Sequence, residues 1–383
     1  MPAYVTERQM PMKIECNREH LLSAVQSAGT VVPSRSPKEI LKHLKLTVLE
    51  GSAVLMATDM DIGIRIEVPE IQVEAPGSVV LPVKEFGSLL RESTDESLKI
   101  EVDLQGVIVR GERSEFKLPV VNPEEFPEVP TFEEEQFHEL PARLYREMIR
   151  RTLFATDTES SRYALGGVLL EFGSDSLIGV GTDGRRLAKM EGTAQAVNGH
   201  QPGDAMTIVP TRAMQLMERT LSEADAQVQI AVHPNHILVR SARVTVYTRL
   251  VEGRFPKWRE VFPTRKEGVT IEIAVGPMLQ SLRQAAVVAS MESRGIDFTF
   301  GDGGLVLSAT TAEIGQSRVD LPISYDGKLI TVTLDHRYVE EFLRVLDLEK
   351  TFSVEIEDSE SAALFTTDDG YGYVVMPLAR EHK

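Results

Sequence analysis

Hydrophobic positions recur along the chain in a fixed order of short alternating stretches and longer helical ones. In the first third, Leu21, Leu22 and Val25 stand at helical spacing, and the helix that they predict stops at Gly29. Short apolar or alternating stretches before and after it predict strands. The predicted strands are 12–16, 44–49, 53–58, 62–68, 79–81, 98–102, 106–110 and 116–120, and the predicted helices are 18–28 and 83–91. This third therefore has the order strand, helix, three strands, and then the same order again.

The landmarks of the first third recur in the other two. The stretch 177–190, which contains Thr182, has an earlier copy at 54–59 and a later copy at 305–311. Two further sets of landmarks keep the same spacing, namely Pro82, Pro210 and Leu334 before helical stretches, and Phe126-Pro127 with Phe255-Pro256. The spacing is about 125 residues, close to one third of the chain. The sequence thus predicts an α+β fold of three tandem domains, each an internally duplicated strand-helix-three-strand unit.

Size and composition are those of an ordinary globular protein. The chain has 383 residues, of which 42% are hydrophobic and 26% are charged, and this length suits two or three domains. No apolar run approaches the ~18–20 residues of a membrane helix, and the N-terminus lacks a signal pattern. A single cysteine, Cys16, excludes an internal disulfide framework and a multi-thiolate metal site. We therefore expect a cytoplasmic protein.

Connections rich in proline and acidic residues predict the domain boundaries. They lie at 122–140 and 262–269, after a disordered extension at 1–11. The predicted domains are 12–131, 140–262 and 268–383. The acidic run 133–135 in the first connection favours a solvated linker over a binding site for a basic partner.

The formal net charge of −17 argues against a protein whose whole surface coats nucleic acid, so the placement of its basic residues matters. In the predicted helix at 141–151, Arg143, Arg146 and Arg150 share one stripe, and the apolar residues cover the opposite face. Other predicted helices carry basic residues more sparsely, at Lys84, Arg91, Arg212, Arg219, Arg283, Arg337 and Arg344. These positions form either a segregated basic surface or solvated faces paired locally with glutamates.

The sequence patterns of catalytic and metal sites are missing. His233-Pro234-Asn235-His236 has no further ligand at metal spacing, so we interpret it as a hairpin turn. Gly301-Asp302-Gly303-Gly304 lacks a following phosphate-binding pattern and is also a turn. We expect no catalytic residue, no metal and no cofactor. The alternative is a repeated α+β enzyme that uses His233 and His236, or a carboxylate pair, as its site.

Two apolar features could form a contact surface. Asp183-Gly184 predicts a type I′ hairpin turn, since glycine accepts positive φ. Beyond the turn, Leu187 alternates onto the face of Arg185 and Lys189, so it either contacts a partner or folds into the core. The end of the chain, 373–378, is apolar on both faces and is either a buried last strand or part of a groove.

Taken together, the threefold repeat, the stretch 182–188, Gly253-Arg254-Phe255-Pro256 and the terminal stretch 373–378 resemble the bacterial DNA polymerase III beta subunit family, the replicative sliding clamps. The resemblance runs from about Met12 to Arg380. It implies three DNA-clamp domains per chain and a head-to-tail homodimeric ring, with helices inside and antiparallel sheets outside. It also implies a processivity factor without catalytic activity, in which a basic bore encloses duplex DNA through contacts to phosphates.

The resemblance assigns three sets of site residues. The implied pocket for partner peptides is formed by Arg162, Leu165, Thr182, Gly184, Arg186, Leu187, Pro256, Val261, Ser359, Val374, Val375, Met376, Pro377 and Leu378. The implied DNA-facing residues are Arg35, Lys84, Arg91 and Arg212, and we expect departures from the family pattern to shift the DNA track toward Arg143, Arg146 and Arg150 of the basic stripe. The implied dimer seam brings Phe116 and Leu118 of one copy to Val287 and Val288 of the other. Three positions depart from the family pattern: Thr211 and Glu260 replace arginines of the DNA track, and Ser293 replaces an aromatic residue at the seam.

The implied partners are double-stranded DNA without sequence preference, a second copy of the chain, and proteins that dock through short Leu/Phe-bearing peptides. The resemblance gives the last group as the replicative polymerase alpha subunit, clamp-loader subunits, translesion polymerases, mismatch-repair proteins and ligase. A peptide-binding scaffold that does not bind DNA is a further alternative.

Overall fold

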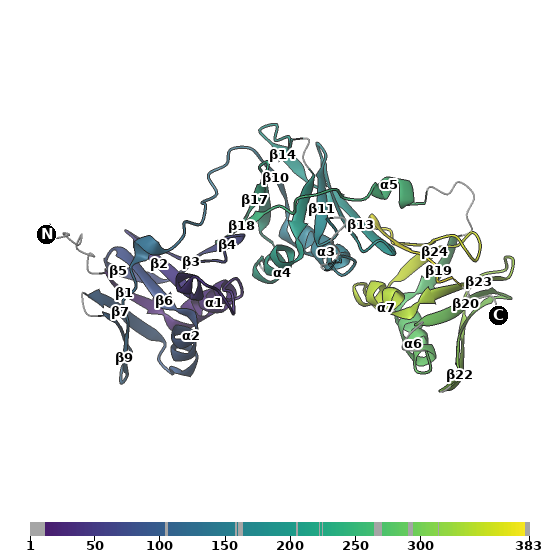
Figure 1. Ribbon diagram of the computed structural model, residues 1–383, viewed down its shortest axis with the longest axis horizontal. Helices are drawn as coiled ribbons and strands as arrows, with labels where there is room; N and C mark the ends of the chain where they lie inside the picture. Colours follow the sequence, from purple (N-terminus) through teal and green to yellow (C-terminus); the bar gives the residue numbers. More distant parts are fainter. Residues whose placement is uncertain are drawn as a thin grey trace. The chain divides into compact units, whose positions relative to one another are not determined.

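The computed structural model describes residues 12–379 except 104–105, 158, 160–163, 204–205, 222, 224, 264–269, 290–293 and 313, and Figure 1 labels its elements. The extension predicted at 1–11 lies outside the described residues. The chain divides into two compact units, one of Met1–Arg143, Ala196–Gly203 and Gln215–Leu250, the other of Leu144–Gln195, Asp204–Met214 and Val251–Lys383.

Each third of the chain contains two half-units, and each half-unit is one strand, one helix and three strands. In the first third the elements are β1 (Met12–Asn17), α1 (Arg18–Gly29), η1 (Glu39–Lys42), β2 (His43–Leu49), β3 (Ser52–Thr58), β4 (Ile62–Glu67), β5 (Ile71–Ala75), β6 (Gly77–Pro82), α2 (Val83–Glu92), β7 (Ser97–Asp103), β8 (Gly106–Arg110), β9 (Glu115–Leu118) and η2 (Pro123–Glu125). The predicted order is confirmed. The sequence did not predict β5, an edge strand whose side chains are half-buried or exposed, so its apolar pattern is weak.

The middle and last thirds repeat this order. The middle third has β10 (Phe137–Pro141), α3 (Ala142–Leu153), β11 (Gly167–Phe172), β12 (Ser176–Thr182), β13 (Arg186–Thr193), β14 (Gln195–Val197), β15 (Thr207–Pro210), α4 (Thr211–Thr220), β16 (Gln227–Val232), β17 (His236–Ser241) and β18 (Val244–Arg249). The last third has α5 (Trp258–Val261), β19 (Thr270–Ala274), α6 (Val275–Ala286), β20 (Gly295–Gly301), β21 (Gly304–Thr311), β22 (Gly315–Pro322), β23 (Ile330–Asp335), α7 (His336–Arg344), β24 (Thr351–Glu355), β25 (Ala363–Thr366) and β26 (Tyr371–Val375).

The first strand of each half-unit pairs into the sheet of the other half-unit in the same third. β1 joins β7, β8 and β9, for example, whereas β6 joins β2, β3 and β4. This exchange fastens the two halves of a third together, and the helices α1 and α2 of the first third pack against each other, as α6 and α7 do in the last (Figure 1). Each third is therefore one structural domain of duplicated halves.

Two of the sheets continue from one third into the next through the final strands of half-units. β4 pairs with β18 in the nine-stranded sheet β14-β10-β16-β17-β18-β4-β3-β2-β6. β13 pairs with β26 in the eight-stranded sheet β15-β11-β12-β13-β26-β25-β24-β19. The final strands β9 and β22 instead end their own sheets, β5-β1-β7-β8-β9 and β22-β21-β20-β23.

The acidic run in the connection between the first and middle thirds is largely exposed, as predicted for a solvated linker, but the connection also carries buried apolar residues. Phe126 and Val129 are buried in a cluster with Met56 and Val80, and Phe132 packs on Ala231 and Leu238. The apolar residues of the connection alternate with its acidic residues. The apolar side chains pack against the protein, and the acidic side chains face solvent or polar partners. The composition of the acidic run concealed this pattern.

Two turns predicted from the sequence are confirmed. The His233–His236 stretch is the turn between β16 and β17, closed by a 2.9 Å bond from His233 N to His236 O. The 301–304 stretch is the turn between β20 and β21, where Asp302 and Gly303 both have positive φ.

Candidate partner-binding site and DNA-facing residues

The turn between β12 and β13 is held by side chains as well as by its glycine. The Thr182 hydroxyl donates to Arg186 O at 2.6 Å and accepts from Gly184 N at 3.1 Å. The Asp183 carboxylate accepts from the backbone N of Arg185 at 2.9 Å and of Arg186 at 3.0 Å. Gly184 has φ +87°, but Asp183 does not have positive φ, so the prediction of a type I′ turn was wrong. The hydrogen bonds of Thr182 and Asp183 stabilise a turn longer than the two-residue type I′ turn, and within it Gly184 is the residue with positive φ.

Beside this turn lies a buried apolar cluster of side chains from several segments. Leu187 is 3% exposed and joins the cluster, which answers the open question of whether it folds into the core. The other members are Ala164, Leu169, Val180, Ile208, Phe255, Trp258, Leu364 and Val374, with Ile178, Val251, Phe262 and Ala362 packed at the margin. Trp258 is fixed by a 3.1 Å bond from its indole N to Glu171. The resemblance did not assign Phe255 or Trp258 to the pocket, although Phe255 is part of the Phe255-Pro256 landmark and Trp258 follows it closely.

The end of the chain forms the buried last strand of a sheet. β26 pairs with β13 on one side and β25 on the other, and Val374 and Val375 are at most 1% exposed. Beyond the strand, Met376 N donates to Arg185 O at 2.9 Å and Leu378 N donates to Thr333 O at 2.8 Å. Met376 itself is 43% exposed, so its side chain is accessible from solvent.

The structure brings most of the candidate pocket residues to one region of the second unit. Leu187 and Val374 belong to the cluster, and Thr182, Gly184 and Arg186 form the turn beside it. Val375 ends the last strand and 376–378 follow it. Leu165 is buried but is not a member of the cluster, Pro256 is half-buried, and Val261 and Ser359 are exposed. Arg162 lies outside the described residues.

Two glycines of β12 let helix α3 approach the sheet of the second unit closely. A Cβ on Gly181 would stand 2.1 Å from Thr152 O, and one on Gly179 would stand 2.7 Å from Met148 Cγ. This contact buries Met148 and fixes the face of α3 that turns away from solvent.

The basic stripe of α3 is only partly free. Arg143 is exposed, and Arg146 is half-buried with its Nε enclosed and unbonded. Arg150 donates to Glu147 at 2.8 Å and to Val345 O at 3.0 Å. Arg151, which the stripe does not include, turns inward to Asp369 at 2.7 Å. The other candidate DNA-facing residues, Arg35, Lys84, Arg91 and Arg212, are exposed.

The candidate seam residues belong to the two different units. Phe116 on β9 is 41% exposed and Leu118 is half-buried. Val287, just after α6, is 75% exposed and borders a groove of about 410 Å³ lined also by Gly276, Leu279 and Leu348. Val288 is half-buried, and Ser293 lies outside the described residues.

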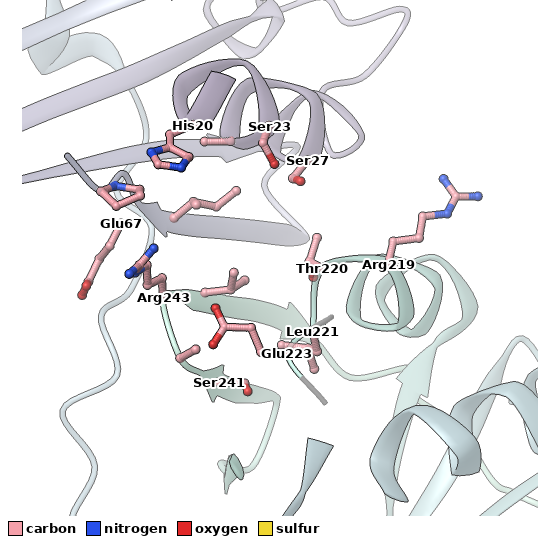
Figure 2. Close-up of a pocket in the computed structure, with 15 residues that line it drawn as sticks. His20, Ser23, Ser27, Glu67, Arg219, Thr220, Leu221, Glu223, Ser241 and Arg243 are labelled. Atoms are coloured by element: carbon pink, nitrogen blue, oxygen red, sulfur yellow. The ribbon is translucent and has the colours of Figure 1, made fainter. Parts of the chain in front are cut away.

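A further hollow of about 280 Å³ lies in the first unit between α1 and the turn after β17. Figure 2 shows His20, Ser23 and Ser27 of α1 on one side and Ser241 and Arg243 on the other, while Arg219 points away from it. The charged residues that line it are exposed, so solvent can satisfy them. The hollow therefore does not require a ligand.

Four histidines and one glutamate gather near the β16–β17 turn. His138 and His200 are buried and share a 2.7 Å bond between their Nδ1 atoms, and His233 bonds Glu134 at 3.0 Å. The rings of His233 and His236 are stacked with centroids 4.3 Å apart. In the described part of the chain, no three His, Cys, Asp or Glu residues are placed to hold a metal ion.

We expect the protein to lose stability in mild acid because of His200. Burial, and then its neighbours His138 and His233, lower the pKa of His200 to about 4. The unfolded chain, with a histidine pKa of about 6.5, binds this proton more readily. The free energy of unfolding is therefore fully present above about pH 6.5 and falls as the pH drops toward 4. Urea unfolding at neutral pH and at about pH 5 measures the loss.

The control for this prediction is a histidine outside the cluster. His200→Gln is expected to reduce the difference in unfolding free energy between the two pH values, and His43→Gln is expected to leave it unchanged. An equal pH dependence in the wild type and His200→Gln would contradict the assignment.

No helix within the described ranges is long and apolar enough to span a membrane. Each third of the chain is a pair of duplicated half-units, and three such pairs in one chain define a protein of the DNA-clamp class. Models of the DNA polymerase III beta subunit match the chain with the N-terminal domain at 12–130, the central domain at 139–257 and the C-terminal domain at 259–379. The chain belongs to the DNA polymerase III beta subunit family.

Individual relatives agree along nearly the whole length. The chain is 28% identical over 380 residues to the beta sliding clamp of Escherichia coli K12, covering 96% of this chain and 100% of the relative. It is 27% identical over 368 residues to that of Chlamydia muridarum, covering 96% and 99%. The crystal structure of a DnaN sliding clamp from Pseudomonas aeruginosa bound to griselimycin matches with a TM-score of 0.88 at 26% identity, over 96% of this chain and 100% of that one.

Proposed function

We propose that the chain is the sliding clamp of a DNA polymerase III, a non-catalytic processivity factor that closes as a head-to-tail homodimeric ring around duplex DNA. The observation that supports a closed ring is the way in which the final strands of the half-units pair. β4 pairs with β18 and β13 pairs with β26, which leaves β9 and β22 as the final strands that pair with no other final strand in the described residues. If β9 of one copy pairs with β22 of the other, all final strands follow one rule and both free edges are covered.

Side chains near these two edges support the same contact. Phe116 stands on β9, and the groove beside Val287 is apolar and follows α6, the helix that packs on β22. A homodimer with this contact has two identical seams, and each covers apolar side chains that a monomer exposes.

The distribution of charge supports enclosure of DNA. The chain carries a net charge of −17, yet basic residues gather on α3 and recur on other helices. We propose that Arg35, Lys84, Arg91, Arg143, Arg146, Arg150 and Arg212 face the DNA. Contacts of this kind go to phosphates and read no sequence, so the ring can slide while closure keeps it on the duplex.

The apolar cluster beside the 182–186 turn supports a peptide pocket. Its floor is formed by branched and aromatic side chains, which suit the Leu or Phe anchor of a short segment. A disordered tail that orders on docking is expected to bind with about micromolar affinity, near −8 kcal/mol, and such affinity permits exchange. We propose that the polymerase alpha subunit, clamp-loader subunits, translesion polymerases, mismatch-repair proteins and ligase use this pocket in turn.

The deciding experiment combines mass and topology. Native mass spectrometry is expected to give twice the 42.5 kDa mass of the chain. After loading by the clamp loader, the protein is expected to stay with a nicked circular plasmid through gel filtration and to leave when the plasmid is linearised, because a ring slides off a free end.

The alternatives predict other outcomes. A peptide-binding scaffold without DNA binding would capture peptides but would not remain on the circle. A protein held by direct DNA affinity would remain on linear and circular DNA alike, which would contradict the proposed ring.

A further inference from the structure

The 182–186 turn has a copy in the first domain that lacks its arginine. There, the Thr58 hydroxyl donates to Ile62 O at 2.8 Å and accepts from Met60 N at 3.0 Å. The Asp59 carboxylate accepts from Asp61 N at 3.0 Å and from Ile62 N at 2.8 Å. Met60 has φ +86°, where Gly184 has +87°. Since Ile62 stands where the middle domain has Arg186, the turn does not need an arginine to form.

The Arg186 guanidinium is nevertheless enclosed by bonds. Its side chain is 8% exposed and pairs with Asp183 at 3.0 Å and with Glu341 of α7. It also donates to Phe154 O at 2.7 Å and lies 4.3 Å from the ring centroid of Tyr338. A buried cation is costly unless every partner is present, so the loss of one carboxylate would leave Arg186 poorly compensated.

Arg186 is also tied to the floor of the candidate pocket. It is paired with Val375 in the β13–β26 ladder, and the next residue along, Leu187, is paired with Val374. The tail residue Met376 bonds the backbone of Arg185. A shift of Arg186 therefore moves two cluster residues and the start of the tail together.

We propose that Glu341 is a positioning residue for the peptide pocket, an inference that rests on the function proposed for that pocket. Glu341 belongs to α7 and is not part of the apolar cluster. It holds the Arg186 guanidinium, and through it the turn, β13 and the tail, in the arrangement that receives a peptide. Its effect on affinity passes through Arg186.

The neighbouring residue on α7 provides a matched control. Glu340 pairs with Arg283 at 3.0 Å and with Arg344 at 2.7 Å, and neither of those arginines belongs to the turn or the cluster. The Glu340 side chain is 18% exposed and the Glu341 side chain is 41% exposed, so Glu340→Gln removes the charge of the more buried of the two carboxylates.

The experiment measures the dissociation constant of a labelled, synthetic Leu/Phe-bearing peptide by fluorescence anisotropy with the full chain. Glu341→Gln is expected to weaken binding about tenfold, within the range of couplings between residues of one ion-pair network. Glu340→Gln is expected to bind as the wild type does. In an Arg186→Met background, Glu341→Gln is expected to change affinity no further, which a general loss of stability would not reproduce.

The outcomes separate this inference from the proposed pocket. If the wild type does not bind the peptide, the pocket itself is refuted. Wild-type binding with an unaltered Glu341→Gln variant, or additive effects of the two substitutions, would overturn the positioning role alone. If Glu341→Gln does not fold, Glu341→Asp keeps the charge on a shorter side chain and is expected to weaken binding as well, and full wild-type affinity in that variant would count against the proposal.

Discussion

Phe116→Asp is expected to convert the dimer into monomers. Phe116 is 41% exposed on the free edge strand β9, and the proposed seam places it against apolar side chains of the second copy. A carboxylate there would lose the contact and would have to be buried without a partner. Central aromatic residues of interfaces contribute about 2–4 kcal/mol when truncated, and the ring has two seams. The dimer dissociation constant is therefore expected to rise by about a thousandfold or more, as measured by sedimentation or light scattering.

The matched control places the same charge on an equally accessible apolar residue elsewhere. Leu49, at the end of β2, is 58% exposed and belongs to neither free edge strand, so Leu49→Asp is expected to remain dimeric. Val287→Asp, on the opposite side of the proposed seam, is expected to behave like Phe116→Asp. A dimeric Phe116→Asp protein would show that copies meet through other surfaces, and a monomeric Leu49→Asp protein would show that the effect is not specific.

The repeat was the part of the fold most open to prediction, because it is written in local signals. A strand that alternates, a helix with one apolar face and a turn such as Thr182-Asp183-Gly184 each depend on neighbours in sequence. Each signal was weak alone, but the same signals recurred at one spacing. The strands β5 and β14 escaped prediction because edge strands with little burial need no clear apolar pattern.

Contacts between distant segments could not be predicted from residue patterns. Arg186 and Glu341 are 155 residues apart, and nothing in the local sequence of either indicates the other. The burial of Phe126 and Phe132 likewise depends on strands that are distant from them in the sequence. The resemblance named Arg186 as a pocket residue, and the structure shows that its guanidinium is bonded within the protein, which is the basis of the supporting role proposed for it.

Deletions at the end of the chain are expected to separate folding from partner binding. Deletion from Val374 removes two buried residues of β26, a strand paired on both sides. The loss of two buried valines and of their ladder hydrogen bonds is expected to cost about 5 kcal/mol, a large share of the stability of a typical domain. Urea unfolding is expected to show this loss, and any reduction in peptide binding would follow from it.

Deletion from Met376 leaves β26 complete and removes only the tail. The fold loses the bonds from Met376 N to Arg185 O and from Leu378 N to Thr333 O, both beyond the sheet. We expect the free energy of unfolding to fall by only about 1–2 kcal/mol, while peptide affinity drops about tenfold or more because Met376, Pro377 and Leu378 no longer line the pocket. Anisotropy titration and urea unfolding of the two deletions, side by side, make the comparison. Unchanged affinity in the shorter deletion would place the peptide elsewhere, since a folded protein would then bind without the tail.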